Sequence, residues 1–343
     1  MKRSAFIKIL YSIWISTLIA VNFSQAQSKV GTSAVPFLGM SVSARATAMG
    51  TAFVGVADDA TSLYYNPGGI VNSGPVALTA SYTDWILDTQ FNWLGFIYNF
   101  DGNNALGVGV TYLDYGEEEV TTVTSPEGTG EMWSAGDLAL SVSYARNLTD
   151  KFSIGGSAKY IQSTIWNETA TSFALDVGLL FITPFDGMKL GMSISNFGTE
   201  MQYSGQDLIK QIDLDPDKLG HNESIVANLK TQTWPLPLFF RVGLSKYILE
   251  TSEFSWLLAV DALRPSDNQE QVNIGSEIGL YDRFFLRGGY QSLFENDREE
   301  GLTAGFGLRW PMANGMTWRL DYTFAEYGIL ENNIHMFALG FEL

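Results

Sequence analysis

The sequence predicts an all-β fold, namely a 14-stranded antiparallel transmembrane β-barrel preceded by an N-terminal hatch or plug. Three observations support this fold class. After residue 75, bulky apolar residues alternate with small or polar residues at a period of two. Most of the alternating segments have about the 9 to 11 residues that a tilted strand needs to cross a bilayer. The links between them are, with few exceptions, short and long in turn.

The first 26 residues read as a secretory signal peptide. Lys2 and Arg3 form a positively charged start, an apolar stretch follows over residues 7–21, and Ser24-Gln25-Ala26 is a small-residue cleavage pattern. A permanent helical anchor is the alternative, but Lys8 interrupts the apolar stretch. We therefore expect export and cleavage, with the signal peptide spanning residues 1–26.

The mature chain is strongly acidic. Its formal charge changes from -17 to -20 when the three basic residues of the signal peptide are removed. Such a balance leaves no basic stripe for phosphates, so we expect no nucleic-acid partner. The absence of Cys excludes a disulfide scaffold. No linker divides the chain after residue 75, so we expect a hatch segment over residues 27–74 and one barrel over residues 75–343 in a bacterial outer membrane.

The alternation is clear in single segments. Over residues 105–114, Leu106 and Val108 alternate with small residues such as Gly107, which places bulky side chains on one face. The bulky face ends in aromatic residues such as Tyr112, as interface girdles do. Lipid is therefore the expected partner of this face.

Fourteen segments show this pattern. They are 75–83, 90–100, 104–114, 135–147, 151–163, 171–182, 187–197, 236–247, 254–263, 271–281, 283–291, 301–310, 316–325 and 333–343. Links after even-numbered segments are short, whereas links after odd-numbered segments are mostly longer, so both termini of the chain are expected on the periplasmic side. A large soluble β-sandwich or propeller is the alternative, but it would not need alternating link lengths.

The opposite parity carries charged residues, which we expect to face the lumen. A charge that faces lipid at mid-depth would cost about 2–4 kcal/mol. Glycine recurs on the same face, where it allows other backbone to approach closely. We interpret the charges as pairing with one another and with a plug, and a role in substrate binding is the alternative. The predicted lumen-facing residues are Lys159, Asp176, Lys189, Arg241, Asp261, Glu277, Arg287, Arg309, Arg319 and Asp321.

The candidate plug precedes the first strand. Residues 41–56 are rich in small side chains and could form a short helix or a compact turn. Asp58-Asp59 offers an N-cap for a helix over 60–65, and Asn66-Pro67-Gly68-Gly69 should end that helix. An ordinary periplasmic extension is the alternative.

This segment resembles the N-terminal signature of the PorV/PorQ family. The matching runs are Ser43-Ala44-Arg45-Ala46, Ala48-Met49-Gly50, residues 52–60 and Tyr64-Tyr65-Asn66-Pro67-Gly68-Gly69-Ile70. Later runs, such as Leu286-Arg287-Gly288-Gly289-Tyr290, resemble the family in the same order. The resemblance implies a barrel of the FadL type with an N-terminal hatch, in which Gly68 stands where the family more often has Ala. The implied hatch residues are Arg45, Met49, Gly50, Asp58, Asp59, Asn66, Pro67 and Gly68.

The resemblance implies two functions. Proteins of the PorV/PorQ family belong to the type IX secretion machinery and handle cargo at the outer membrane, whereas FadL-like proteins move hydrophobic small molecules inward. The implied partners are secretion subunits or secreted cargo in the first case and a hydrophobic small molecule in the second. The end of the chain resembles the assembly signal of outer-membrane barrels through Phe337, Leu339, Phe341 and Leu343.

Catalysis has little support in the sequence. His221 and His335 are the only histidines, and neither belongs to a triad or a metal-ligand cluster. The acidic loop over 198–235 could hold Ca²⁺ weakly, but its spacing matches no compact ligand cage. We therefore expect no enzymatic activity, no metal and no cofactor.

Overall fold

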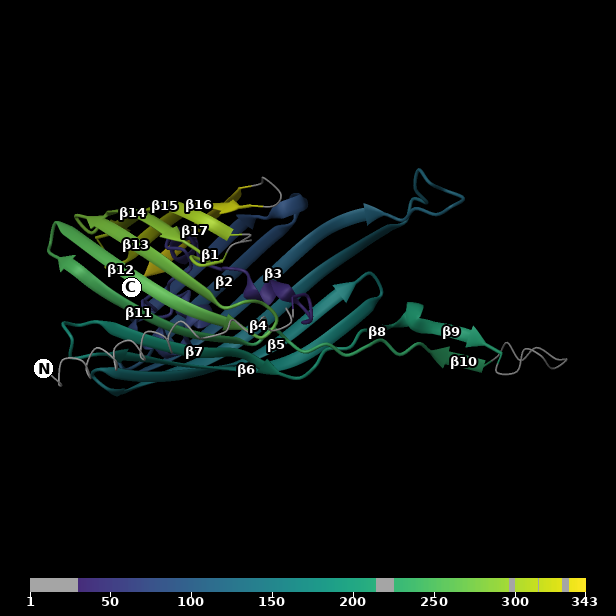
Figure 1. Cartoon of the computed structure of the whole chain (residues 1–343), viewed down its shortest axis with the longest axis horizontal. Helices are drawn as coiled ribbons and strands as arrows, with labels where there is room; N and C mark the ends of the chain where they lie inside the picture. The colour runs from purple at the N-terminus through teal and green to yellow at the C-terminus, as the bar shows by residue number, and fades with distance from the viewer. Residues whose placement is uncertain (1–29, 214–224, 296–299, 314, 329–332) are drawn as a thin grey trace, which may run out of the picture.

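The fold is seen in a computed structural model that describes residues 30–213, 225–295, 300–313, 315–328 and 333–343. Fourteen long strands of the main sheet form a closed antiparallel barrel (Figure 1). These strands are β1 (Val76–Asp84), β2 (Gln90–Asn99), β3 (Asn104–Glu119), β4 (Met132–Thr149), β5 (Phe152–Ile165), β6 (Glu168–Ile182), β7 (Lys189–Gly198), β11 (Phe239–Glu250), β12 (Phe254–Pro265), β13 (Gln271–Leu280), β14 (Phe284–Tyr290), β15 (Glu300–Pro311), β16 (Thr317–Tyr327) and β17 (Ile334–Glu342).

The barrel closes between its first and last strands. In the pairing of β1 with β17, Ala77 lies opposite Glu342 and Asp84 opposite His335. Every barrel strand therefore has two hydrogen-bonded neighbours, which is the arrangement that lipid requires of a spanning sheet. The predicted number of strands and the closed antiparallel topology are confirmed.

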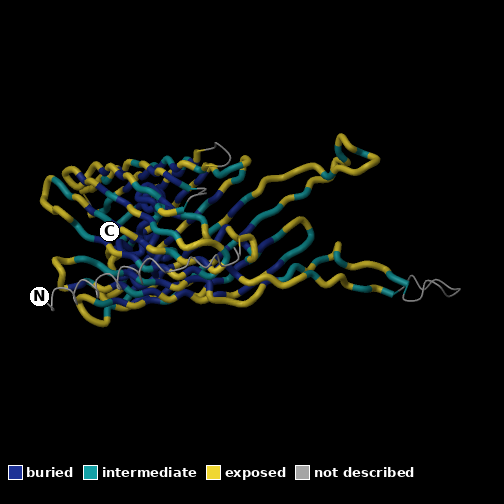
Figure 2. The backbone as a smooth tube through the Cα atoms, viewed as in Figure 1, coloured by how far each residue is buried: buried dark blue, intermediate teal, exposed yellow. Residues whose placement is uncertain are grey.

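The two faces of the barrel wall differ in polarity and packing. Leu106 and Val108 point outward and are 48% exposed each, whereas the inward Ala105 between β2 and β4 is fully buried. Figure 2 shows buried backbone along the barrel interior and exposed backbone along its outer rim and loops. A contiguous apolar outer band of this kind is stable in contact with lipid.

The hairpin of β3 and β4 extends beyond the sequence prediction. β3 and β4 continue past the predicted limits at 114 and 135, as far as Glu119 opposite Met132. The ladder resumes there after a register shift between Asp114 and Glu117. Alternation alone did not reveal this extension, because a polar hairpin outside the membrane no longer separates an apolar from a polar face.

The two ends of the barrel carry different connections. We call the end with the links 85–89, 120–131, 199–238, 266–270, 291–299 and 328–333 the loop end, and the opposite end the turn end. The hairpin of β3 and β4 projects from the loop end, as does a small sheet of β9 (Ile209–Ile212) and β10 (Ile225–Asn228) (Figure 1). Three shorter elements lie nearby, namely η3 (Ile86–Asp88), β8 (Ser204–Gly205) and η4 (Gln206–Leu208), the last two before β9.

The N-terminal segment forms four short helical elements, namely η1 (Pro36–Gly39), α2 (Ala44–Ala48), α3 (Ser62–Tyr65) and η2 (Pro67–Asn72). The predicted N-cap at Asp58-Asp59 is wrong, because α3 begins later, after Thr61. Asp59 instead accepts hydrogen bonds from the backbone N–H and the hydroxyl of Thr61, at 2.9 Å and 2.5 Å, in the turn before the helix. No helix among the described residues is long and apolar enough to cross a membrane.

The N-terminal segment crosses the lumen from the loop end to the turn end. At the loop end, the backbone N–H of Ala34 donates to the carbonyl of Pro235 at 2.8 Å. At the turn end, Asn99 donates to the carbonyl of Val71 at 2.9 Å, just before β1 begins. The predicted signal peptide lies outside the described residues. The first described residues are thus at the opposite end of the barrel from Leu343, whose N–H donates to the carbonyl of Val76.

Candidate functional site

A buried ion-pair network connects α2 to the barrel wall. The guanidinium of Arg45 binds Glu277 of β13 with two hydrogen bonds of 2.8 Å each, from Nε and Nη2. Its Nη1 also contacts Asp58 at 2.6 Å and Asp59 at 3.2 Å. A fork of this geometry is specific to Arg and could not be reproduced by Lys.

The network continues along the inner face of the barrel. Arg287 of β14 contacts Glu277 at 2.6 Å and Asp321 at 2.5 Å. Arg319 of β16 contacts Asp59 at 3.3 Å, and its Nη1 reaches Glu342 near the end of the chain at 2.5 Å. Both ends of the network thus meet residues of the N-terminal segment, whose ion pairs hold it directly against β13 and β16.

Electrostatic contacts of the N-terminal segment shift its pKa values. Burial by itself would raise the pKa of Asp59, but the positive charges of Arg319 and Arg45 lower it below its usual value. Burial would likewise lower the pKa of Arg45. The negative charges of Asp58, Glu277 and Asp59 outweigh this effect and raise the pKa above its usual value. Both groups therefore stay charged although they are buried.

A second polar cluster lies on the inner face of β5, β6 and β7. The ammonium of Lys159 contacts Asp176 at 2.6 Å and the side-chain oxygen of Asn196 at 2.8 Å. Asp176 accepts the backbone N–H of Asn196 at 2.8 Å, where β6 and β7 shift register. Asn196 was not singled out from the sequence, and its positive φ of 65° at the register shift is the feature that explains its place there.

Asp261 binds the N-terminal segment through its backbone. One carboxylate oxygen, Oδ2, accepts the N–H groups of Phe53 and Val54 at 2.7 Å and 2.8 Å.

Two further predicted lumen residues lie near the turn end instead. Lys189 is half-buried opposite Ser245, and Arg309 forms a partly exposed ion pair of 2.6 Å with Asp282. These two residues do not contact the network.

Glycines of the wall receive the backbone of the N-terminal segment. A Cβ on Gly275 would lie 2.2 Å from the carbonyl oxygen of Met49, and a Cβ on Gly289 would lie 2.1 Å from the nitrogen of Gly50. Gly50 itself adopts a φ of 61°, which favours glycine. Absent side chains on the wall thus allow two backbones to touch.

The Asn66-Pro67-Gly68 turn packs against β5 and β6. The amide of Asn66 donates to the carbonyl of Val54 at 3.0 Å and to the carbonyl of Leu179 in β6 at 2.9 Å. Its side-chain oxygen accepts the N–H of Gly68 at 3.1 Å. A Cβ on Gly68 would lie 2.7 Å from the carbonyl oxygen of Gly178, so this turn fits glycine closely.

Serine and threonine side chains of the wall, which the sequence reading passed over, satisfy carbonyl groups of the segment. Ser153 binds the carbonyl of Gly68 at 2.6 Å, and Ser193 binds that of Tyr65 at 2.8 Å. The signal that could have found them is parity, since they alternate with bulky residues just as the inner glycines do. The other members are Ser81 with Val42, Ser245 with Gly55, Thr303 with Ala48 and Thr323 with Ala44.

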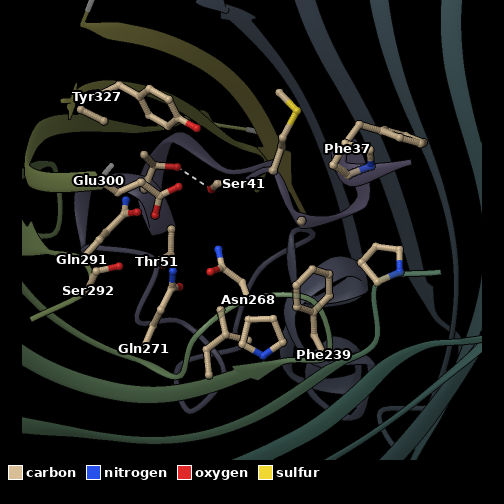
Figure 3. Close-up of a pocket in the computed structure, with 18 of the residues that line it drawn as sticks. Phe37, Ser41, Thr51, Phe239, Asn268, Gln271, Gln291, Ser292, Glu300 and Tyr327 are labelled. Carbon is tan, nitrogen blue, oxygen red and sulfur yellow. Dashed lines mark hydrogen bonds between the residues drawn. The ribbon is translucent and has the colours of Figure 1, made fainter. Parts of the chain in front are cut away.

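A cavity of about 740 Å³ lies between the N-terminal segment and the loop end. Its lining residues include Phe37 and Ser41 of the segment, Phe239 of β11 and Tyr327 of β16 (Figure 3). The remaining wall comes from links at the loop end, such as residues 265–271, and from strand residues such as Arg241 and Leu263. The segment therefore forms one side of a chamber whose other walls are the barrel and its loops.

Residues outside the lumen show no catalytic arrangement within the described part of the chain. His335 is half-buried and hydrogen-bonds Tyr322 at 2.8 Å across β16 and β17. The described residues contain no group of three or more side chains suited to hold a metal ion. Phe337, Leu339 and Leu343 are about half exposed, and Phe341, which has the same parity, packs on Trp318.

Comparisons with solved structures show the same kind of barrel. The monoaromatic hydrocarbon channel CymD has a TM-score of 0.54 and 12% identity, over 88% of this chain and 96% of that chain. The toluene transporter TodX of P. putida has a TM-score of 0.52 and 11% identity, over 86% of this chain and 95% of that chain. At such identities the likeness shows the fold alone. No curated protein sequence matches the chain.

The sequence itself matches a known family model. The model of the type IX secretion system protein PorV matches residues 23–215, which is more than half of the chain and includes the N-terminal segment and the first seven barrel strands. The family and the fold are those of outer-membrane transport or secretion barrels, which sit in the lipid bilayer. The chain belongs to the family of the type IX secretion system protein PorV.

Proposed function

We propose that this barrel docks or handles exported polypeptides at its loop end, as part of or beside a type IX secretion machine. The observation that carries the proposal is the locking of the N-terminal segment across the lumen. Arg45, Asp59 and the backbone of residues 42–71 are held by buried ion pairs and hydrogen bonds to strands all round the barrel. A lumen occupied in this way favours binding at one end over free passage.

The N-terminal segment acts in this proposal as a hatch. It spans residues 27–74 of the mature chain, after cleavage of a signal peptide at residue 26, and precedes the barrel of residues 75–343. The residues that hold the hatch in place are the predicted ones, namely Arg45, Met49, Gly50, Asp58, Asp59, Asn66, Pro67 and Gly68. In this proposal the loop end of the barrel faces the cell surface. N-terminal sequencing of the protein from outer membranes tests the cleavage and should begin at Gln27. A chain that still begins at Met1 would contradict it.

Copurification tests the docking function. The protein is isolated from its own membranes in gentle detergent, and its partners are identified by mass spectrometry. Secretion subunits or secreted cargo should copurify with the complete barrel and be depleted from a variant that lacks residues 118–131 and 206–230 at the loop end. If no such protein copurifies, while the barrel retains a lipid-like ligand, the docking proposal is wrong.

The walls of the loop-end cavity favour a second candidate, the passage of hydrophobic small molecules. Phe37, Met40, Leu113, Phe239 and Leu263 give this cavity an apolar lining, and apolar pockets with a few polar groups are typical of small-molecule sites. Uptake of an aromatic hydrocarbon into proteoliposomes would test it. Uptake by the intact protein, above that of a variant in which the hatch is cross-linked to the wall, would support the channel; equal uptake would exclude it.

A further inference from the structure

Two projections leave the loop end of the barrel (Figure 1). The first arm, as we call it, is the hairpin over residues 115–134, and the second arm comprises residues 199–213 and 225–238. The ladder of the barrel does not continue unbroken into either arm. The pairing of β3 with β4 shifts register between Asp114 and Glu117, and β7 ends before the second arm begins. Such interruptions allow an arm to bend, so contacts at its root decide its direction.

A buried carboxylate lies between the two roots. Asp137 of β4 is 3% exposed, and its Oδ2 accepts a hydrogen bond of 2.8 Å from the hydroxyl of Tyr115, at the root of the first arm. Its Oδ1 accepts a hydrogen bond from the hydroxyl of Ser163 of β5, which in turn lies 2.7 Å from the hydroxyl of Tyr203 in the second arm. Because a serine hydroxyl has only one proton to donate, Tyr203 must donate to Ser163. Three hydroxyl groups thus connect both arms to one carboxylate.

Asp137 depends on these hydroxyl groups. Its side-chain partners in the described part of the chain are Tyr115 and Ser163, with no Lys or Arg among them. This distinguishes it from Glu277 of the ion-pair network, which meets two guanidinium groups. A buried acceptor that loses a donor bears the full cost of its desolvation. The carboxylate therefore favours the one arrangement of the arms in which the hydroxyl groups reach it.

The turn between β5 and β6 also contacts both arms. On one side, the backbone N–H of Trp166 donates to the carbonyl of Ser134 in the first arm at 2.8 Å. On the other side, the side-chain amide of Asn167 donates to the carboxylate of Asp207 in the second arm at 2.9 Å. The backbone N–H of Asp207 donates to the carboxylate of Glu168 at 3.0 Å. These contacts do not involve Asp137, yet they join the same two arms.

We propose that Asp137 is a positioning residue that joins the two arms, so that they act as one preorganised docking surface for an exported polypeptide. The inference rests on the proposed docking function and adds how the docking surface keeps its shape. Long links lose conformational freedom when a partner binds across them, and this loss weakens binding. Arms that are already fixed relative to each other avoid much of it. A partner that contacts both arms is therefore bound more tightly when Asp137 is intact.

The distance between the arms tests the coupling. The chain has no Cys, so the substitutions E118C in the first arm and I209C in the second provide two unique sites for spin labels. Double electron–electron resonance of the full-length barrel in detergent then measures the distribution of the distance between the labels. We expect a single narrow distribution with Asp137 present. The distribution should become about twofold broader in D137A, because both arms lose their shared acceptor.

Variants that lack a single hydroxyl group refine this test. Y115F and Y203F each remove one donor from the cluster and should broaden the distribution less than D137A does. Y160F is the matched control, because the hydroxyl of Tyr160 bonds Gln162 of the same strand and neither arm. It should leave the distribution unchanged. The circular dichroism spectrum of each variant shows whether the barrel is folded. If D137A does not fold, the two tyrosine variants decide the test.

Copurification of exported proteins with the unlabelled variants tests whether the coupling serves docking. We expect about tenfold less exported protein with D137A than with the unaltered barrel, and an unchanged amount with Y160F. Equal distance distributions in the unaltered protein, D137A and Y203F would overturn the coupling. If the arms loosen but the amount of exported protein is unchanged, the inference fails while docking stands. If the unaltered protein copurifies with no exported protein, the docking function itself fails, and the inference fails with it.

Discussion

At the residue scale, Glu277 is the point where the N-terminal segment and the wall are joined most directly. Its carboxylate contacts Arg45 from the segment and Arg287 from the neighbouring strand, and it is 3% exposed. Two guanidinium groups thus share this one buried anion. Breaking such a group on one side leaves uncompensated charge, which is more damaging than the interaction itself is stabilising.

The substitution Glu277→Gln should therefore loosen the N-terminal segment. We expect the N-terminal segment to lose about 3–5 kcal/mol of stability, because Arg45 and Arg287 each lose one of their buried anionic partners. Limited proteolysis within residues 30–74 measures the effect. A second measure is the heat-dependent gel shift, that is, the temperature at which the folded barrel unfolds and changes its mobility in an SDS gel. The control Arg264→Gln breaks an exposed pair with Glu270 at 3.6 Å and should change neither readout. Equal behaviour of the two variants would show that the network does not hold the segment.

A second prediction concerns Gly68, where the PorV/PorQ family more often has Ala. The substitution Gly68→Ala should displace the Asn66-Pro67 turn, because its Cβ would lie 2.7 Å from backbone oxygen of β6. We expect the N-terminal segment to lose about 1–3 kcal/mol of stability, which would be measured as faster proteolysis of that segment. Gly288→Ala is the matched control, since no atom lies within 4 Å of that position. If both variants resist protease as the unaltered protein does, the turn tolerates Ala by moving.

A third prediction concerns acidity. Arg319 and Arg45 hold the pKa of Asp59 below its usual value, so the charged form stabilises the segment above about pH 4, the ordinary pKa of an Asp. This contribution is lost as the pH falls through the lowered pKa. Proteolysis of the segment should therefore accelerate in strong acid, and the acceleration should be smaller in Asp59→Asn. An identical pH profile in that variant would assign the acid sensitivity to other carboxylates.

At the scale of elements, the strands were the part most open to prediction. Their period of two follows directly from having lipid on one side and packed lumen on the other. The hairpin beyond residue 114 was missed, because both of its faces meet water. The N-terminal helices were placed only approximately, since four short elements that are held by wall side chains carry little periodicity of their own.

The hydroxyl groups of the wall should matter to the N-terminal segment more than to the strands that carry them. Replacing Ser153, Ser193 and Ser245 with Ala together leaves the carbonyls of Gly68, Tyr65 and Gly55 without these donors. We expect about 1 kcal/mol of lost stability for each site. Hydrogen exchange of the segment, compared with that of the strands, measures it. An equal change in a Ser255→Ala control, a site with no hydrogen bond to the segment among the described residues, would contradict the role.

At the scale of the whole molecule, the barrel is closed and its long loops are additions to it. The sheet of β9 and β10 projects away from the wall, and its flanks meet where Thr231 donates to the carbonyl of Tyr203 at 2.7 Å. Deleting residues 206–230 and joining Gly205 to Thr231 should leave the heat-dependent gel shift unchanged, because no barrel strand is interrupted. A lost shift would mean that this projection takes part in closing the barrel.

The sequence by itself determined the barrel, the number of its strands and the side of each strand that carries charge. These features follow from local alternation and from link lengths, which need no knowledge of distant contacts. The tertiary structure alone decided which carboxylate meets which guanidinium, because Arg45 and Glu277 are 232 positions apart in the chain. It also decided that the N-terminal segment crosses the lumen and leaves a chamber at the loop end, since that chamber exists only where separate links and strands meet.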